Sequence, residues 1–147
     1  DQGDVQGAVR YFDQAAEKFS TPRHKQLAQL KSAYLLADQG AYSDVIARVS
    51  PLAETEAPYE FLARELLGFA HFEAGDVVSA RKEFAYLTSV PGVPATVKQR
   101  AEQSMALIGA KSTLQAPSPL TNPVPDTASE APSEPDTTTQ EDVTNED

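Results

Sequence analysis

Cysteine and tryptophan are absent from the 147-residue sequence, and only two histidines occur in it. The lack of cysteine excludes disulfides, thiolate nucleophiles and cysteine-ligated zinc, and it is compatible with reducing and oxidising compartments alike. The two histidines, His24 and His71, are far apart and belong to no metal-binding spacing. We therefore expect neither a metal ion nor any other cofactor.

Motifs that support catalysis or phosphate binding are also missing. Serine and threonine are plentiful, but none lies in a nucleophile elbow or in a spacing that indicates a Ser/His/Asp arrangement. The pairs Gly3-Asp4 and Gly75-Asp76 lack the further glycines and the lysine of a phosphate-binding loop. We predict that the protein is not an enzyme and has no catalytic residues.

Positive charge is scarce, with 12 lysines and arginines against 22 aspartates and glutamates, so we expect no nucleic-acid partner. The acidic excess is greatest in residues 111–147, which hold eight acidic side chains, six prolines and a single basic residue, Lys111. Their few apolar side chains cannot offset the entropy lost on ordering the segment. We predict a folded domain in residues 1–110 and a disordered, proline-rich acidic tail in residues 111–147. The tail is either a solvating spacer or an arm for a basic partner.

Apolar residues within 1–110 recur three and four positions apart, which is the spacing of one helix face. Residues 26–39 show it between a start signal at Thr21-Pro22 and a stop signal at Gly40, and the same order returns between Pro58 and Gly75. Further helices are predicted over residues 5–19 and, with a one-sided face typical of a capping helix, over residues 95–108. No run of about 18 apolar residues is present, so the sequence contains no membrane span.

A short pattern that begins at a glycine occurs three times, and its glycines are 37 and 35 residues apart. After each glycine an alanine or valine is followed, four positions later, by a valine or phenylalanine. The spacing is close to the period of about 34 residues of the tetratricopeptide repeat, whose unit is a pair of antiparallel helices. The copies are Gly3-Asp4 with Ala8 and Phe12, Gly40-Ala41 with Val45 and Val49, and Gly75-Asp76 with Ala80 and Phe84.

Residues 61–91 resemble the tetratricopeptide motif most closely, through Leu67-Gly68, Gly75-Asp76, Ala80, Phe84 and Leu87. They depart from it at Arg64, which replaces an aromatic residue, at His71, which replaces a tyrosine, and at Pro91, which comes one residue early.

The other two copies are less complete. In the middle copy Ser32-Ala33 replaces the Leu-Gly pair, and Pro51 is predicted to end or kink the second helix. The first copy has only its second helix, so we expect a C-terminal fragment of a longer product. We predict an all-α fold of two to three stacked helical hairpins, an α-solenoid, with a C-terminal capping helix.

Residues 1–110 further resemble the tetratricopeptide repeat-like domain of bacterial ancillary SecYEG translocon subunits, alphaproteobacterial ones above all. The resemblance implies an inner-membrane protein with a single spanning helix, which would precede Asp1, and with this domain on the periplasmic side. The segments that carry it are Ala33-Tyr34-Leu35-Leu36, Gly40-Ala41-Tyr42, Val49-Ser50-Pro51-Leu52-Ala53, Ala57-Pro58-Tyr59, Ala63-Arg64-Glu65-Leu66-Leu67-Gly68 and Ala74-Gly75-Asp76.

In this repeat class the first helix of each hairpin lines a concave groove, which predicts the partner-binding residues. Phe72 and Glu73 are the preferred pair, because an aromatic anchor beside a charge suits peptide recognition. The full set is Leu27, Leu30, Tyr34, Leu62, Glu65, Phe69, Phe72 and Glu73.

The expected function is that of a noncatalytic interaction scaffold that associates with the translocon or assists newly translocated polypeptides. The expected partners are the translocon or unfolded polypeptides, and contact with the membrane is expected only through the upstream anchor. A cell-envelope assembly or division coordinator built on the same repeats is the alternative. An enzyme accessory subunit is the alternative from another class.

Overall fold

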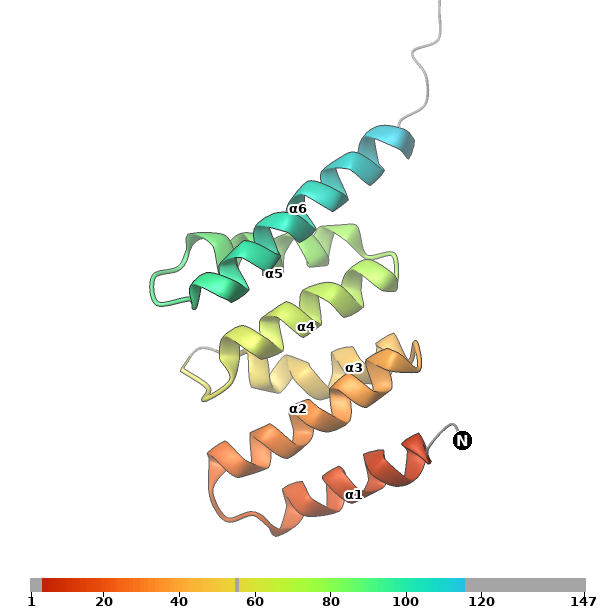
Figure 1. Cartoon of the computed structure of the whole chain (residues 1–147), viewed down its shortest axis with the longest axis vertical. Helices are drawn as coiled ribbons and strands as arrows, with labels where there is room; N and C mark the ends of the chain where they lie inside the picture. Colours follow the sequence, from red (N-terminus) through yellow and green to blue (C-terminus); the bar gives the residue numbers. More distant parts are fainter. Residues whose placement is uncertain (1–3, 55, 116–147) are drawn as a thin grey trace, which may run out of the picture. The chain divides into compact units, whose positions relative to one another are not determined.

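The structure is a computed structural model that describes residues 4–54 and 56–115, and within these residues it is all-α (Figure 1). The all-α prediction is therefore confirmed. Residues 116–147, most of the predicted tail, lie outside the described residues. The helices are α1 (Val5–Lys18), α2 (Pro22–Asp38), α3 (Tyr42–Val49), the short 3-10 helix η1 (Ser50–Ala53), α4 (Glu60–Glu73), α5 (Val77–Ser89) and α6 (Ala95–Gln115).

Two of the helices end at the glycines that the repeat pattern singled out. Gly40 and Gly75 have φ angles of 72° and 86°, a left-handed conformation that glycine adopts without a steric penalty. The next backbone amide reaches back into the helix in both cases, from Ala41 to the Leu36 carbonyl at 3.0 Å and from Asp76 to the His71 carbonyl at 2.8 Å. These bonds satisfy carbonyls that the helix end would leave open, which explains why α2 and α4 stop where they do.

Pro51 ends α3, as the sequence predicts. The α-helix stops at Val49, and the chain continues as η1 over Ser50–Ala53. The last helix differs from the prediction, since α6 continues to Gln115 instead of stopping near Ile108. Of the four residues on its predicted inner face, Val97, Ala101 and Ile108 are buried and Met105 is half-buried.

Each helix packs on the next one along the chain, from α1 through to α6, and α4 also contacts α2 and α6 (Figure 1). Because successive helices run in opposite directions, α2, α4 and α6 run in the same direction. The buried apolar residues form two clusters rather than one. The first cluster lies among α1 to α4, the second lies among α4 to α6, and Leu62 of α4 packs against both.

A close contact between α4 and α5 depends on Gly68. A Cβ atom added at Gly68 would meet the ring of Phe84 at 3.0 Å and the Cβ of Glu83 at 3.3 Å. The equivalent positions in the middle copy are Ala33 and Val49, both fully buried. Gly68, the smaller residue on the first helix, is thus paired with Phe84, the larger residue on the second, whereas Ala33 is paired with the smaller Val49. This compensation in size keeps the space between the paired helices filled.

Gly68→Ala is expected to lower the free energy of unfolding by about 1 kcal/mol, because overpacking against the buried Phe84 ring outweighs the gain in helix propensity. Gly109→Ala in α6 is the matched control, since an added Cβ there meets no atom within 4 Å. It is expected to raise the free energy of unfolding by about 0.5–1 kcal/mol. Urea unfolding followed by circular dichroism measures both.

Phe84→Val supplies the second half of this test, because with Gly68→Ala it recreates the Ala33 and Val49 pair. The decrease in the free energy of unfolding caused by Phe84→Val is expected to be at least about 0.5 kcal/mol smaller in the Gly68→Ala background than in the wild type. Additive effects of the two substitutions would contradict the size compensation.

Candidate functional site

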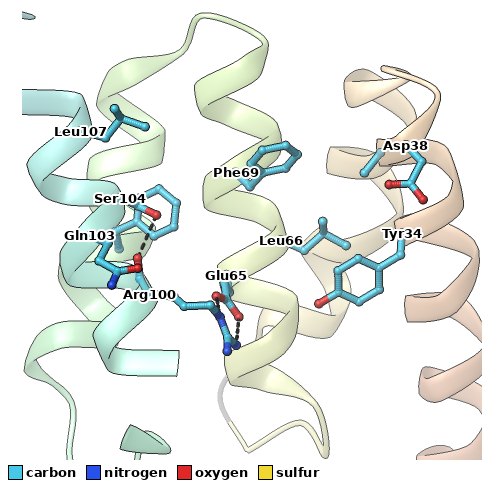
Figure 2. Close-up of a pocket in the computed structure, with 11 residues that line it drawn as sticks. Tyr34, Asp38, Glu65, Leu66, Phe69, Arg100, Gln103, Ser104 and Leu107 are labelled. Carbon is cyan, nitrogen blue, oxygen red and sulfur yellow. Dashed lines mark hydrogen bonds and ion pairs between the residues drawn. The ribbon is translucent and has the colours of Figure 1, made fainter. Parts of the chain in front are cut away.

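The three parallel helices α2, α4 and α6 enclose a cleft of about 530 Å³ (Figure 2). This volume lies within the range of about 300–1,000 Å³ that is typical of ligand sites. Each helix contributes residues from successive turns, so the cleft runs along the helices. Its lining residues are Tyr34, Ala37, Asp38, Glu65, Leu66, Phe69, Phe84, Arg100, Gln103, Ser104 and Leu107.

Large apolar side chains in this cleft remain open to solvent. Tyr34 is 42% exposed, Phe69 41% and Leu107 60%, one from each of the three helices. Phe69 is also held from the side by Tyr42 of α3, whose ring makes an edge-to-face contact with a centroid distance of 6.0 Å. This contact packs part of the Phe69 side chain against α3 and leaves the rest exposed in the cleft.

One end of the cleft is closed by an ion pair between α6 and α4. Arg100 binds the carboxylate of Glu65 with both arms of its fork, Nε to Oε1 at 2.5 Å and Nη2 to Oε2 at 2.7 Å (Figure 2). This bond raises the pKa of Arg100 above its usual value. The adjacent Tyr34 has a raised pKa, chiefly because it is buried and also because Glu65 is near, while Arg100 acts in the opposite direction.

The opposite end has a different character. Phe69 lies one turn beyond Glu65 on α4, and Asp38 lies one turn beyond Tyr34 on α2. Leu107 of α6 lies at the same end (Figure 2). A smaller adjoining recess of about 80 Å³ continues from there, and Phe72 and Glu73 line it together with Phe69 and Leu107. The cleft therefore passes from a neutralised ion pair at one end to an apolar end with the Asp38 carboxylate, which makes no ion pair within residues 4–54 and 56–115.

The structure places the sequence-predicted groove residues in three different settings. Tyr34, Glu65 and Phe69 line the cleft, and Phe72 and Glu73 line the adjoining recess. The remaining three, Leu27, Leu30 and Leu62, line neither.

Of those three, Leu30 is only 3% exposed and belongs to the first core cluster. Leu27 is half-buried outside both hollows. Leu62 lines a separate hollow beside Pro58 and Pro94. His71 is half-buried, and its Nδ1 lies 3.4 Å from Asp76 Oδ2.

Sequence reasoning missed the contribution of α6, because that helix was interpreted only as a cap. The signal was the 35-residue spacing itself. Counting 35 positions from Glu65 reaches Arg100, and counting 35 from Phe72 reaches Leu107. Asp38 was missed as well, since its position at the end of α2 indicates a helix terminus more readily than a binding surface.

A buried polar cluster holds α4, the central helix of the cleft, against α5. Glu60 and Glu83 are only 7% and 8% exposed, and Arg64 binds both, Nε to Glu60 Oε1 at 3.2 Å and Nη1 to Glu83 Oε2 at 2.9 Å. The Tyr86 hydroxyl donates to Glu60 Oε1 at 2.6 Å, and the Arg64 guanidinium lies 3.8 Å from the Tyr86 ring centroid. Arg64, which departs from the tetratricopeptide pattern, thus has an internal structural role.

The charge state of this cluster follows from its bonds. Burial by itself would raise the pKa of Glu60, but hydrogen bonds from Tyr86, from the Glu56 backbone amide and from Arg64 outweigh it and lower that pKa. Because the folded-state pKa is the lower one, the stabilisation is complete above the ordinary glutamate value of about 4.3. It is lost as the pH falls through the folded-state value.

Among the described residues there is no group of three or more metal-ligating His, Cys, Asp or Glu side chains. Nor does any helix in residues 4–54 and 56–115 combine the length and apolar character needed to cross a membrane. In comparisons with protein-family models, curated proteins and solved structures, nothing matches this chain. The solenoid arrangement and the kinship with translocon subunits therefore stay predictions from the sequence.

Tyr86→Phe is expected to lower the free energy of unfolding by about 1.5–3 kcal/mol at pH 7, because it removes a hydrogen bond to a buried carboxylate. The loss should shrink as the pH falls through the folded-state pKa of Glu60, because protonation of this carboxyl group removes the charge-assisted part of the bond. Tyr11→Phe is the matched control, since Tyr11 is 69% exposed, and it should change nothing. A loss that stays the same throughout an acid titration would contradict the assigned charge state.

Proposed function

We propose that the protein is a noncatalytic polypeptide-binding module and that the cleft between α2, α4 and α6 is its binding surface. The proposal rests on one observation, the cleft of about 530 Å³ in which Tyr34, Phe69 and Leu107 stay exposed. Large apolar side chains gathered in a hollow are typical of sites that bind peptides or proteins. A single exposed apolar residue on a flat surface carries no such meaning.

The rigidity of the cleft supports the same proposal. Phe69 of its aromatic wall packs against Tyr42, and the Arg100–Glu65 pair ties the outer helix α6 to the central helix α4. A partner would therefore bind without first ordering the protein, and this lowers the entropy cost of association. The described part of the chain has no strand to extend, so side chains that enter the hollow would supply the contacts.

The clients that we propose are unfolded or partly folded polypeptides. A cleft that is mainly apolar, with few polar groups to fix one geometry, fits segments that share an apolar side chain rather than one defined sequence. The sequence resemblance supports a specific setting for such an activity. We propose that this domain is the periplasmic part of a membrane-anchored, translocon-associated protein that assists newly translocated polypeptides.

Phe69→Ala is expected to weaken binding of a permanently unfolded client about tenfold, because it removes the central aromatic contact of the cleft. Reduced and carboxamidomethylated ribonuclease A is a suitable client, and isothermal titration calorimetry on the full chain measures the affinity. Tyr11→Ala is the matched control, since Tyr11 is an exposed aromatic residue of α1 that does not line the cleft. It should leave the affinity unchanged.

Three outcomes separate the alternatives in this experiment. Equal loss in Phe69→Ala and Tyr11→Ala would place binding outside the cleft. No binding of unfolded client to the wild-type chain would reject the proposed activity. Unchanged circular dichroism in Phe69→Ala is expected, since the side chain is 41% exposed and makes only part of its contacts in the core.

The proposed location has its own test in the native host. The protein with a C-terminal tag should remain in the membrane fraction after carbonate extraction, because a spanning helix resists that treatment. Protease added to spheroplasts should digest this domain. A domain that is protected from protease, or released by carbonate, would reject the anchored periplasmic setting and leave the proposed binding activity untouched.

A further inference from the structure

We propose that the cleft selects polypeptide segments in which a bulky apolar side chain lies next to a lysine or an arginine. The inference rests on the proposed function and specifies its substrate class. It derives from the distribution of charge along the cleft, which is unequal at the two ends.

The charges in the cleft do not cancel. Its charged lining residues are Asp38, Glu65 and Arg100, and the last two neutralise each other through their bidentate contact. Asp38 is exposed, and among the described residues its side chain makes no hydrogen bond and no ion pair. One uncompensated negative charge therefore faces the cleft.

This charge lies at the apolar end. Asp38 and Phe69 line the same end of the cleft, one on α2 and the other on α4 (Figure 2). The adjoining recess is lined by Glu73 and by Phe72, and the Lys111 ammonium lies 4.7 Å from the Phe72 ring centroid. Asp38 is therefore the charged residue of the cleft itself that a bound segment would meet when its apolar side chain packs on Phe69.

Two physical arguments identify the occupant. A cationic side chain beside the apolar anchor gains attraction to Asp38, and the flexible methylene chain of lysine or arginine covers apolar surface on the way. An acidic segment is repelled by the same carboxylate. This disfavours the chain's own residues 111–147, with their eight acidic side chains, and favours a segment from another polypeptide.

Two labelled peptides test the inference by fluorescence anisotropy at low ionic strength on the full chain. They have the sequences GSGKLFKGSG and GSGELFEGSG, and differ only in the charges that flank the apolar pair. The wild type is expected to bind the lysine peptide about five- to tenfold more tightly than the glutamate peptide. Asp38→Asn should abolish this preference, and Asp38→Lys should reverse it.

Controls separate local charge from net charge and from loss of the site. Glu17→Lys, on the exposed surface of α1 and away from the cleft, changes the net charge as much as a reversal at Asp38 and should keep the preference. Phe69→Ala should weaken both peptides equally. Asp38→Lys is tolerated by the fold, because a cation at the C-terminal end of α2 complements the helix dipole.

The failures of the two proposals are distinguishable. If both peptides bind equally tightly, or if Glu17→Lys alters the preference as much as Asp38→Lys, the charge selection is overturned while the cleft remains a polypeptide site. If neither peptide nor the unfolded client binds to the wild type, the proposed function itself fails.

Discussion

The packing of α4 against its neighbouring helices is the constraint on which the rest of this structure depends. Ala63, Leu66, Leu67 and Ala70 enter the first core cluster, and Gly68 lets Phe84 of α5 approach closely. The small residues bring the neighbouring helices close enough to leave only a narrow strip of α4 uncovered. The side chains on that strip, among them Glu65 and Phe69, therefore lie in a hollow between α2 and α6 rather than on an open surface.

Apolar packing and polar contacts have different roles in maintaining this hollow. Burial of apolar side chains supplies most of the stabilisation, at roughly 25 cal/mol per Å² of surface removed from water. The Arg100–Glu65 pair is half-exposed on the arginine side, and such pairs contribute only about 0.2–1 kcal/mol. Its importance is geometric, since a two-pronged contact fixes the position of α6 against α4.

The sequence was sufficient for the local features that single residues control. Gly40, Gly75 and Pro51 each have a backbone requirement that acts regardless of the surroundings, so the helix ends that they set could be predicted. Burial was harder to predict. Leu30 shares the helical spacing of Tyr34, yet it belongs to the first core cluster, which brings together residues from several helices. Which neighbours cover a given face of α2 is a tertiary property.

The cleft itself was predictable only in part, for a related reason. Tyr34, Glu65 and Phe69 lie on helices whose repeat position indicates the groove. Arg100 and Asp38 depend on which side chains of neighbouring helices meet, and helical spacing along one segment does not specify this. Only the continuation of the 35-residue period into α6 contained that information.

The departures from the repeat pattern are informative because most have a partner inside the protein. Arg64 is accounted for by Glu60, Glu83 and Tyr86, and Ser32 donates to Asp13 Oδ1 at 2.9 Å across α1 and α2. A residue whose contacts are all internal needs no external partner to explain it.

Phe69, Leu107 and Asp38 are different, because all three line the same hollow. Within the described residues, Phe69 and Leu107 keep part of their apolar surface exposed and Asp38 has no ion-pair partner. Uncovered apolar area and an unpaired carboxylate bring no stability to the free protein, since burial and pairing are what make such groups stabilising. Their coincidence in one braced cleft is therefore explained more simply by binding than by folding.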